Sequence, residues 1–261
     1  MEYLLISFVA LVVSALTLFS GFGLGTVLMP VFALFFPVPV AVAATAVVHL
    51  ANNLFKVALL GRWANWSIVA RFALPAAVMA MVGAALLTLF DRLPPLVSYQ
   101  LGHQPHQVSV VKLVIALVII AFALFDLLPR FQDVAFDPKY LPLGGMLSGF
   151  FGGLSGNQGA LRSAFLIKAG LDKEAFVGTG VVATVLVDVA RLLVYGLAFY
   201  TTRFDQLGSG VLGLVLAATL AAFVGAVLGR RWLKKVTLRT VQVVVGGGLI
   251  LLGFGLGTGL L

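Results

Sequence analysis

Two rows of polar side chains, each on a long apolar segment, are the residues of this chain best suited to chemistry. The first row contains Thr45, His49, Asn52, Asn53 and Lys56, and the second contains Thr184, Asp188, Arg191 and Tyr195. The spacing in each row places its members on one face of an α-helix. A charged group at the centre of a membrane costs about 2.5–3.5 kcal/mol on insertion scales. A membrane chain that keeps such groups twice is expected to use them.

A glycine-broken segment precedes each row. The first runs from Ser20 to Pro30, and the second runs from Ser148 to Arg162. Glycine allows positive φ and close backbone approach, and a helix that starts after such a break presents unpaired N–H groups and the positive end of its dipole. Polar rows beside broken helices, repeated along an apolar chain, are typical of a transporter with a binding site between two related halves.

The second break carries groups suited to binding an anion. Ser155, Asn157 and Gln158 can hydrogen-bond a ligand at the start of the helix that follows. Arg162 adds a planar guanidinium that can bind an oxyanion through two N–H groups. Two other interpretations stay open, because glycines also permit close helix crossing and Arg162 could extend to the interface or form an ion pair. Thr26 is the candidate ligand of the first break.

The second row contains an acid and a base one turn apart. Asp188 and Arg191 are at positions i and i+3, so they can form an ion pair that fixes packing or gates the site. Direct substrate binding and proton exchange by Asp188 are the alternatives, and the neighbouring Arg191 argues against proton exchange.

The first row contains a lone lysine. Lys56 is preceded by a run of 53 residues, Tyr3–Phe55, without Asp, Glu, Lys or Arg, and it is a candidate substrate ligand together with Asn52 and Asn53. His49 is the candidate proton carrier, because imidazole titrates near neutral pH. A hydrogen-bonded histidine in the core is the other interpretation.

Composition identifies the class of protein. Of 261 residues, 61% are hydrophobic and 10% are charged, whereas a soluble domain has about 25% charged residues. Several charge-free stretches reach the roughly 20 residues that cross a hydrocarbon core. We therefore expect an all-α, multi-pass membrane protein embedded in the lipid bilayer, and no membrane β-barrel. The net charge of +8 indicates basic loops rather than a nucleic-acid partner.

The apolar segments predict two structural repeats, each with a broken or re-entrant helix hairpin and three transmembrane helices. Residues 1–130 are expected to form the first repeat, with a hairpin at 3–36 and helices at about 39–60, 67–90 and 109–128. Residues 131–261 are expected to form the second, with a hairpin at 141–170 and helices at about 174–200, 207–229 and 238–259. The pattern Asn53-x-x-Lys56-x4-Gly61 corresponds to Asp188-x-x-Arg191-x4-Gly196, an offset of 135 residues.

Basic residues predict the orientation. If both broken segments return to the side from which they enter, the two repeats are inverted. One side of the membrane then carries Arg62, Arg71, Arg130, Lys139, Lys168, Lys173, Arg230, Arg231, Lys234, Lys235 and Arg239. The other side carries Arg92, Lys112 and Arg203, and the excess marks the first side as cytoplasmic. If both segments instead cross the membrane fully, the repeats are parallel.

Nothing in the sequence indicates a cofactor or a metal site. The chain has no cysteine, which excludes disulfides, iron–sulfur clusters and thiol catalysis. His103 and His106 lie in the polar connection 91–108 without a neighbouring carboxylate, so we expect them to be solvent-exposed. No enzyme motif is present, and we expect that the protein is not an enzyme.

The broken segments resemble one transporter family. Ser20–Pro30, the helix at Asn53-Leu-Phe-Lys56 and the stretch Ser155–Phe165 are similar to the sulfite exporter TauE/SafE family, also called the 4-toluene sulfonate uptake permease family. The resemblance covers nearly the whole chain and implies a bacterial inner-membrane protein that moves sulfite or organosulfonates. The chain departs from the family at Arg162, where an aliphatic residue is more frequent. It also has Ala164 where its own first half has Pro30.

These observations lead to one hypothesis and three alternatives. We expect an alternating-access transporter of a small sulfur-containing oxyanion. Coupling to a proton through His49 and assembly into a homo-oligomer are both compatible with the sequence. Thr26, Ser155, Asn157 and Gln158 would hydrogen-bond the substrate, and Lys56 and Arg162 would set its charge. An anion channel, a non-transporting assembly factor and an intramembrane enzyme are the alternatives.

Overall fold

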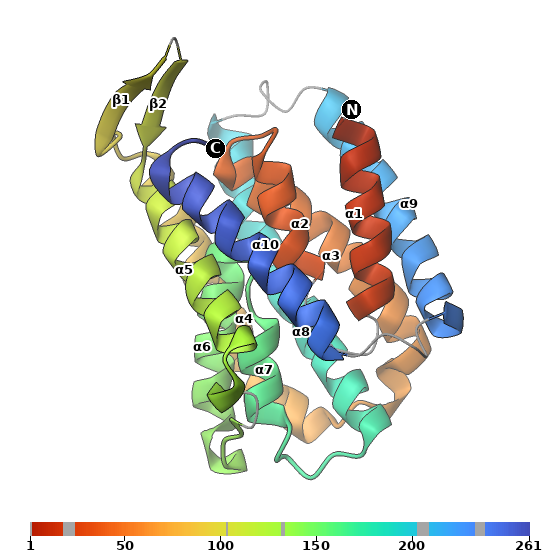
Figure 1. Ribbon diagram of the computed structural model, residues 1–261. Coiled ribbons are helices and arrows are strands. Elements are labelled where there is room, and N and C mark those ends of the chain that lie inside the picture. Colours follow the sequence, from red (N-terminus) through yellow and green to blue (C-terminus); the bar gives the residue numbers. More distant parts are fainter. Residues whose placement is uncertain (1, 18–23, 103, 132–133, 203–208, 233–237) are drawn as a thin grey trace.

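The computed structural model describes residues 2–17, 24–102, 104–131, 134–202, 209–232 and 238–261, which form ten α-helices and one β-hairpin (Figure 1). The first elements are α1 (Glu2–Thr17), α2 (Leu24–Ala33), α3 (Val38–Leu60), η1 (Gly61–Trp63), α4 (Trp66–Asp91), β1 (Val97–Leu101), β2 (Gln104–Val108) and α5 (Val110–Leu127). The later elements are η2 (Pro129–Phe131), η3 (Pro138–Tyr140), α6 (Leu141–Ser155), α7 (Gly159–Leu166), α8 (Lys173–Thr202), α9 (Ser209–Trp232) and α10 (Leu238–Thr258).

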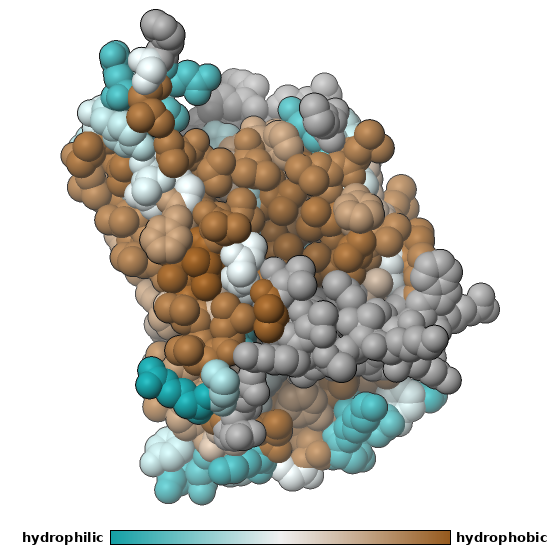
Figure 2. Space-filling model, in the orientation of Figure 1, coloured by the Kyte–Doolittle hydropathy of each residue, from teal (hydrophilic) through white to brown (hydrophobic). Residues whose placement is uncertain are grey.

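The expected all-α membrane architecture is confirmed. Within the described part of the chain, five stretches are long and apolar enough to cross a membrane: Val38–Trp63, Trp66–Asp91, Val110–Leu127, Lys173–Ala198 and Val211–Leu228. Figure 2 shows a broad apolar band between hydrophilic residues at the two ends of the molecule. This is the surface expected of a protein surrounded by lipid, since apolar side chains face the acyl chains and polar ones face water.

The helices next to the breaks are too short to span a membrane. With 10, 15 and 8 residues, α2, α6 and α7 extend for about 15, 22 and 12 Å at 1.5 Å per residue. The hydrocarbon core is about 30 Å thick. The chain leaves α6 at Gly156, whose φ of 82° is a conformation that favours glycine. Residues 18–23, which include the start of the first glycine-broken segment, lie outside the described residues.

The second broken segment folds back on itself. The start of α6 contacts the end of α7, since a Cβ on Gly144 would lie 2.2 Å from the ring of Phe165. Phe136, which precedes α6, stacks on the same ring, with ring centroids 4.2 Å apart, and donates its N–H to the carbonyl of Ala164 at 3.0 Å. The α6–α7 hairpin therefore enters and leaves at the same end of the molecule.

Tight helix seams join distant parts of the chain. Helix α1 packs on α9, and α6 packs on α4. Along the second seam, a Cβ on Gly145, Gly149 or Gly153 would lie 1.9–2.1 Å from a carbonyl oxygen of α4. In the first seam, a Cβ on Gly225 would lie 2.1 Å from the carbonyl oxygen of Leu11. Only glycine allows backbones to approach this closely, so both seams depend on it.

The two ends of the molecule differ in their elements. The α3–α4, α5–α6 and α7–α8 connections lie at one end, and the β-hairpin and both termini lie at the other (Figure 1). Arg62, Arg130, Lys139 and Lys168 fall in the first group of connections, whereas Arg92 follows α4 on the hairpin side.

The β-hairpin lies in the segment that was expected to be a polar connection. Its strands pair in antiparallel register, Tyr99 opposite His106. The hydroxyl of Tyr99 donates to the carbonyl of Thr258 at 2.6 Å, and His106 Nδ1 lies 3.2 Å from the carbonyl oxygen of Gly259. The expectation of a solvent-exposed His106 was wrong, because its half-buried ring stacks on Tyr99. His103 lies outside the described residues.

Candidate functional site

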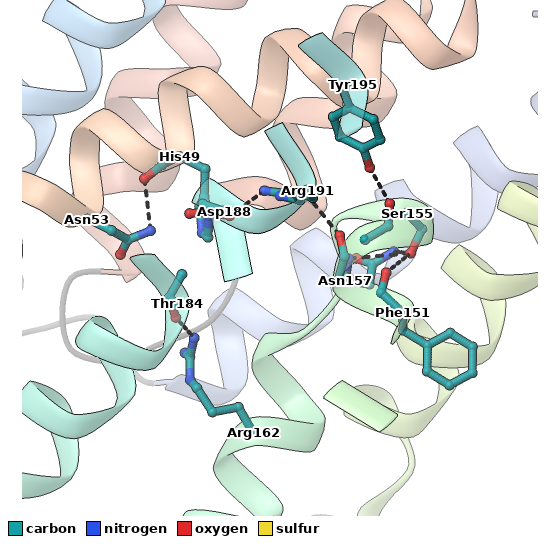
Figure 3. Close-up of polar contacts among 12 residues, drawn as sticks. His49, Asn53, Phe151, Ser155, Asn157, Arg162, Thr184, Asp188, Arg191 and Tyr195 are labelled. Carbon is teal, nitrogen blue, oxygen red and sulfur yellow. Dashed lines mark hydrogen bonds and ion pairs between the residues drawn. The ribbon is translucent and has the colours of Figure 1, made fainter. Parts of the chain in front are cut away.

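The two polar rows meet where α3 packs against α8. Nδ1 of His49 lies 2.8 Å from Oδ2 of Asp188, and Nη2 of Arg191 donates to Oδ1 of the same carboxylate at 2.6 Å (Figure 3). Asp188 and Arg191 are completely buried, and 14% of the His49 side chain is exposed. Both oxygens of the carboxylate are therefore occupied, one by each row.

Helix α8 also holds the end of α6. Nη1 of Arg191 donates to the carbonyl of Gly152 at 3.1 Å, and the hydroxyl of Tyr195 donates to the carbonyl of Gly153. These carbonyls belong to the last turn of α6, where a cation is favourable because the helix dipole places partial negative charge there. Arg191 and Tyr195 thus position the second break.

The residues of the second break bond mostly to one another. The hydroxyl of Ser155 donates to the carbonyl of Phe151 at 3.0 Å and accepts from the side-chain amide of Asn157 at 3.2 Å. The carbonyl of Gln158 accepts from the hydroxyl of Ser148 at 3.0 Å. Ser155 and Ser148 therefore shape the loop, while the side chains of Asn157 and Gln158 keep unused hydrogen-bonding capacity.

The start of α2 approaches the second break. A Cβ on Gly25 would lie 3.4 Å from the carbonyl oxygen of Gly156 and 3.4 Å from Cδ2 of His49. Thr26, the next residue, is buried in the first turn of α2. The first turn of α2, the α6–α7 break and His49 of the first polar row therefore come together at one point.

Arg162 is buried within the protein. Its guanidinium donates through Nη1 to the hydroxyl oxygen of Thr184, which in turn donates to the carbonyl of Gly180 at 2.8 Å (Figure 3). Only 6% of Arg162 is exposed. The interpretation in which this side chain extends to the membrane interface was wrong, because α7 places it against α8 in the interior.

Lys56 is buried without an acidic partner. It is 6% exposed, and its ammonium makes no hydrogen bond or ion pair with any residue that the structure describes. Its charge interacts electrostatically with those of Arg162 and His49. Asn53 lies one turn before Lys56, but its side-chain amide donates to the carbonyl of His49 at 2.8 Å and is not bonded to the lysine. Asn52 faces α1, where its Oδ1 lies 3.4 Å from the hydroxyl oxygen of Ser14.

Buried hydrogen-bonding atoms without a partner are concentrated in the rows and the break. Within the described part of the chain they are Thr45 Oγ1, Asn52 Nδ2, Asn157 Oδ1, Gln158 Nε2 and Arg191 Nε. Buried polar groups are normally bonded, so each of these needs an explanation. Four of the five can donate a hydrogen bond. An excess of donors favours a ligand that offers acceptors only.

Charge favours the same kind of ligand. Lys56, Arg162 and Arg191 are buried, whereas Asp188 is the one buried carboxylate among the residues described by the structure. Burial of an uncompensated charge is costly, and a bound anion relieves that cost. Among the same residues, no group of three or more His, Asp or Glu side chains could hold a metal ion.

Sequence reasoning identified the members of this site but not all of their contacts. It did not foresee the bond between His49 and Asp188, because the two residues are 139 positions apart and each fits its own helix equally well without the other. It also omitted Ser148, whose role depends on the loop that returns to it. The available signal was a serine at the start of the glycine-broken segment, ten residues before Gln158.

Comparison with known proteins agrees with the resemblance noted in the sequence. The family model of the sulfite exporter TauE/SafE matches residues 6–256, which is nearly the whole chain. Searches of curated proteins and of solved structures find no match. The chain therefore belongs to the sulfite exporter TauE/SafE family, a family of membrane transporters.

Proposed function

We propose that this member of the TauE/SafE family carries a small sulfur-containing oxyanion, sulfite or an organosulfonate, across the bacterial inner membrane by alternating access. The buried ammonium of Lys56 is the observation that carries the proposal, because it has no acidic partner among the described residues. A sulfur oxyanion supplies both the negative charge and the acceptors that this lysine and the unpartnered donors need.

The proposal gives the residues distinct roles. Lys56 and Arg162 set the charge of the substrate, and the side chains of Thr26, Asn157 and Gln158 contact its oxygens. The first turns of α2 and α7 add the positive ends of two helix dipoles. Asn52 and Asn53 support the first row, and Ser155 shapes the loop. Asp188 and Arg191 hold the break in place.

Alternating access is proposed to move one seam relative to the other. The first helix of each predicted repeat packs on the fourth helix of the other, as α1 packs on α9 and α6 packs on α4. Each repeat thus contributes the same two helices to contacts with the other, and this packing supports two related, inverted repeats, 1–130 and 131–261. The site lies where the two seams are bridged by α3 and α8, which also pack on each other.

Labelling tests the orientation that this arrangement requires. Asn65, which caps α4, is exposed at the end that carries the α3–α4 connection. Because the chain has no cysteine, Asn65→Cys provides a single thiol. We expect an impermeant thiol reagent to label it only from the cytoplasmic side. Labelling only from outside would reject the proposed orientation.

Transport of labelled sulfite into proteoliposomes tests the function. We expect saturable uptake by the wild type and at least about tenfold lower uptake by Arg162→Ala and Asn157→Ala, since each loses a hydrogen bond to a charged ligand. Arg130→Ala is the matched control, because Arg130 is exposed and stacks on Phe131. Uptake unchanged by both site variants would remove the site assignment, and uptake that does not saturate would indicate a channel.

A further inference from the structure

We infer that Asp188 positions His49 as the proton acceptor for the bound anion, so that the coupled proton and the anion share one site. This inference rests on the proposed function, because it needs an anion between the α6–α7 break and the first turn of α2. It assigns Asp188 a positioning role and makes His49 the residue that contacts the substrate's proton.

The two ring nitrogens of His49 face different neighbours. Nδ1 faces the carboxylate of Asp188 at 2.8 Å, and a carboxylate can only accept, so Nδ1 carries a hydrogen. The opposite edge of the ring faces Gly25, where a Cβ would lie 3.6 Å from Nε2. Nε2 has no hydrogen-bond partner among the residues that the structure describes. Gly25 has no side chain to fill the space beside this nitrogen.

Among the residues that the structure describes, the surroundings of His49 supply charge but no second proton acceptor. Asp188 and Arg191 face it from α8, Lys56 lies on its own helix, and the carbonyl of Gly156 lies beside Gly25. Both oxygens of Asp188 are already hydrogen-bonded, one to His49 and one to Arg191. Asp188 therefore keeps its charge, while Nε2 is available to exchange a proton with a ligand.

The exchange is a simple proton transfer. A hydrogen sulfite ion gives its O–H proton to Nε2, the O–H bond breaks, an N–H bond forms, and sulfite and imidazolium result. The reverse transfer regenerates hydrogen sulfite and neutral imidazole. No electrons are gained or lost, and the site carries one anion together with one proton whichever partner holds the proton. Because Asp188 accepts from Nδ1, the imidazolium formed in this step is stabilised without moving the ring.

The first test separates proton coupling from binding. Proteoliposomes are given a pH gradient with the membrane voltage clamped, uptake of labelled sulfite is measured, and uptake by protein-free liposomes is subtracted. We expect sulfite still to stabilise His49→Gln in a thermal-unfolding assay. Uptake driven by the pH gradient should be at least about tenfold lower in this variant than in the wild type. His106→Gln is the matched control, because His106 lies in the β-hairpin. Gradient-driven uptake retained by His49→Gln would overturn the inference. If wild type shows neither uptake nor stabilisation, the proposed function fails instead.

The second test examines the positioning role of Asp188. We expect Asp188→Asn to move the midpoint of the pH–uptake profile to lower pH by about one unit or more, because the imidazolium loses its neighbouring charge. Asp188→Glu should restore the midpoint. If Asp188→Asn does not fold with Arg191 left unpaired, the double variant Asp188→Asn, Arg191→Gln removes both charges. Uptake that falls with an unchanged midpoint would mean that Asp188 acts on structure alone.

Discussion

Lys56 on α3 and Arg191 on α8 occupy corresponding positions of the two polar rows, yet their surroundings differ. Asp188 precedes Arg191 by one turn and forms an ion pair with it at 2.6 Å. Asn53 precedes Lys56 by the same spacing, but its amide bonds to the backbone of its own helix. Arg191 also donates to the last turn of α6, whereas no described residue accepts from Lys56.

The comparison indicates that the polar row on α8 is structural and that the polar row on α3 binds the anion. A buried cation that is paired and bonded on several sides stabilises one arrangement of the backbone around it. A buried cation with no partner is unfavourable until an anion arrives. Each variant below either removes this difference between α3 and α8 or measures its size.

Arg191→Met is expected to have the largest effect on stability. It leaves the carboxylate of Asp188 without its cation and frees the end of α6, and breaking a buried pair from one side costs about 3–5 kcal/mol. Thermal unfolding in detergent measures this loss. Lys56→Met is the matched variant on α3 and should be at least as stable as the wild type. The comparison fails if Lys56→Met is the less stable of the two.

Lys56→Met is expected to have the largest effect on transport. Loss of its charge should lower sulfite uptake at least about tenfold, because a hydrogen bond to a charged group contributes about 1.5–3 kcal/mol. The control is Lys112→Met, since Lys112 lies in the first turn of α5 and donates to the carbonyl of Gln107 at 3.3 Å. Equal uptake by the two variants would contradict a binding role for Lys56.

Asn53→Asp gives Lys56 the neighbour that Arg191 already has. An aspartate three residues before the lysine can pair with it and neutralise the charge offered to the anion. We expect uptake to fall about tenfold, as for loss of a charge-assisted contact, while the unfolding temperature holds or rises. The measurements are sulfite uptake and thermal unfolding of the same preparation. Undiminished uptake would show that Lys56 does not act through its charge.

Tyr195→Phe is expected to have the smallest effect. It removes one donor to the carbonyl of Gly153 and keeps the ring, so the free energy of unfolding should fall by about 1 kcal/mol. The corresponding residue on α3 is Leu60, which has no hydroxyl. Thermal unfolding of the single variant gives the value. A loss as large as that of Arg191→Met would mean that Tyr195, rather than the ion pair, holds α6.

Much of the fold follows from the sequence because membrane helices leave a strong apolar signal. Long charge-free stretches predict spanning helices, and glycines at Gly156 and Gly159 predict the break between α6 and α7. The β-hairpin was missed because its strands have only five residues each and are mostly exposed. Apolar and polar residues alternate over Val97–Leu101, but Gln104–Val108 shows no matching alternation, so the signal for a strand pair is short and one-sided.

The site residues could be predicted from their types, but their partners could not. A polar residue in an apolar helix is recognisable alone, as Lys56 and Asp188 show. Whether it is paired depends on helices that meet only in the folded protein. His49 and Ser14 illustrate this, since one reaches α8 and the other donates to the carbonyl of Ala222 on α9.

Anomalous diffraction from crystals grown with selenite tests the central claim most directly, because selenium marks the position of a sulfite-like anion. We predict one strong peak between the first turn of α2 and the α6–α7 break, within hydrogen-bond reach of Lys56 Nζ, and no such peak in Lys56→Met. A peak confined to the loops at either end of the molecule, or an identical peak in both proteins, would contradict the account.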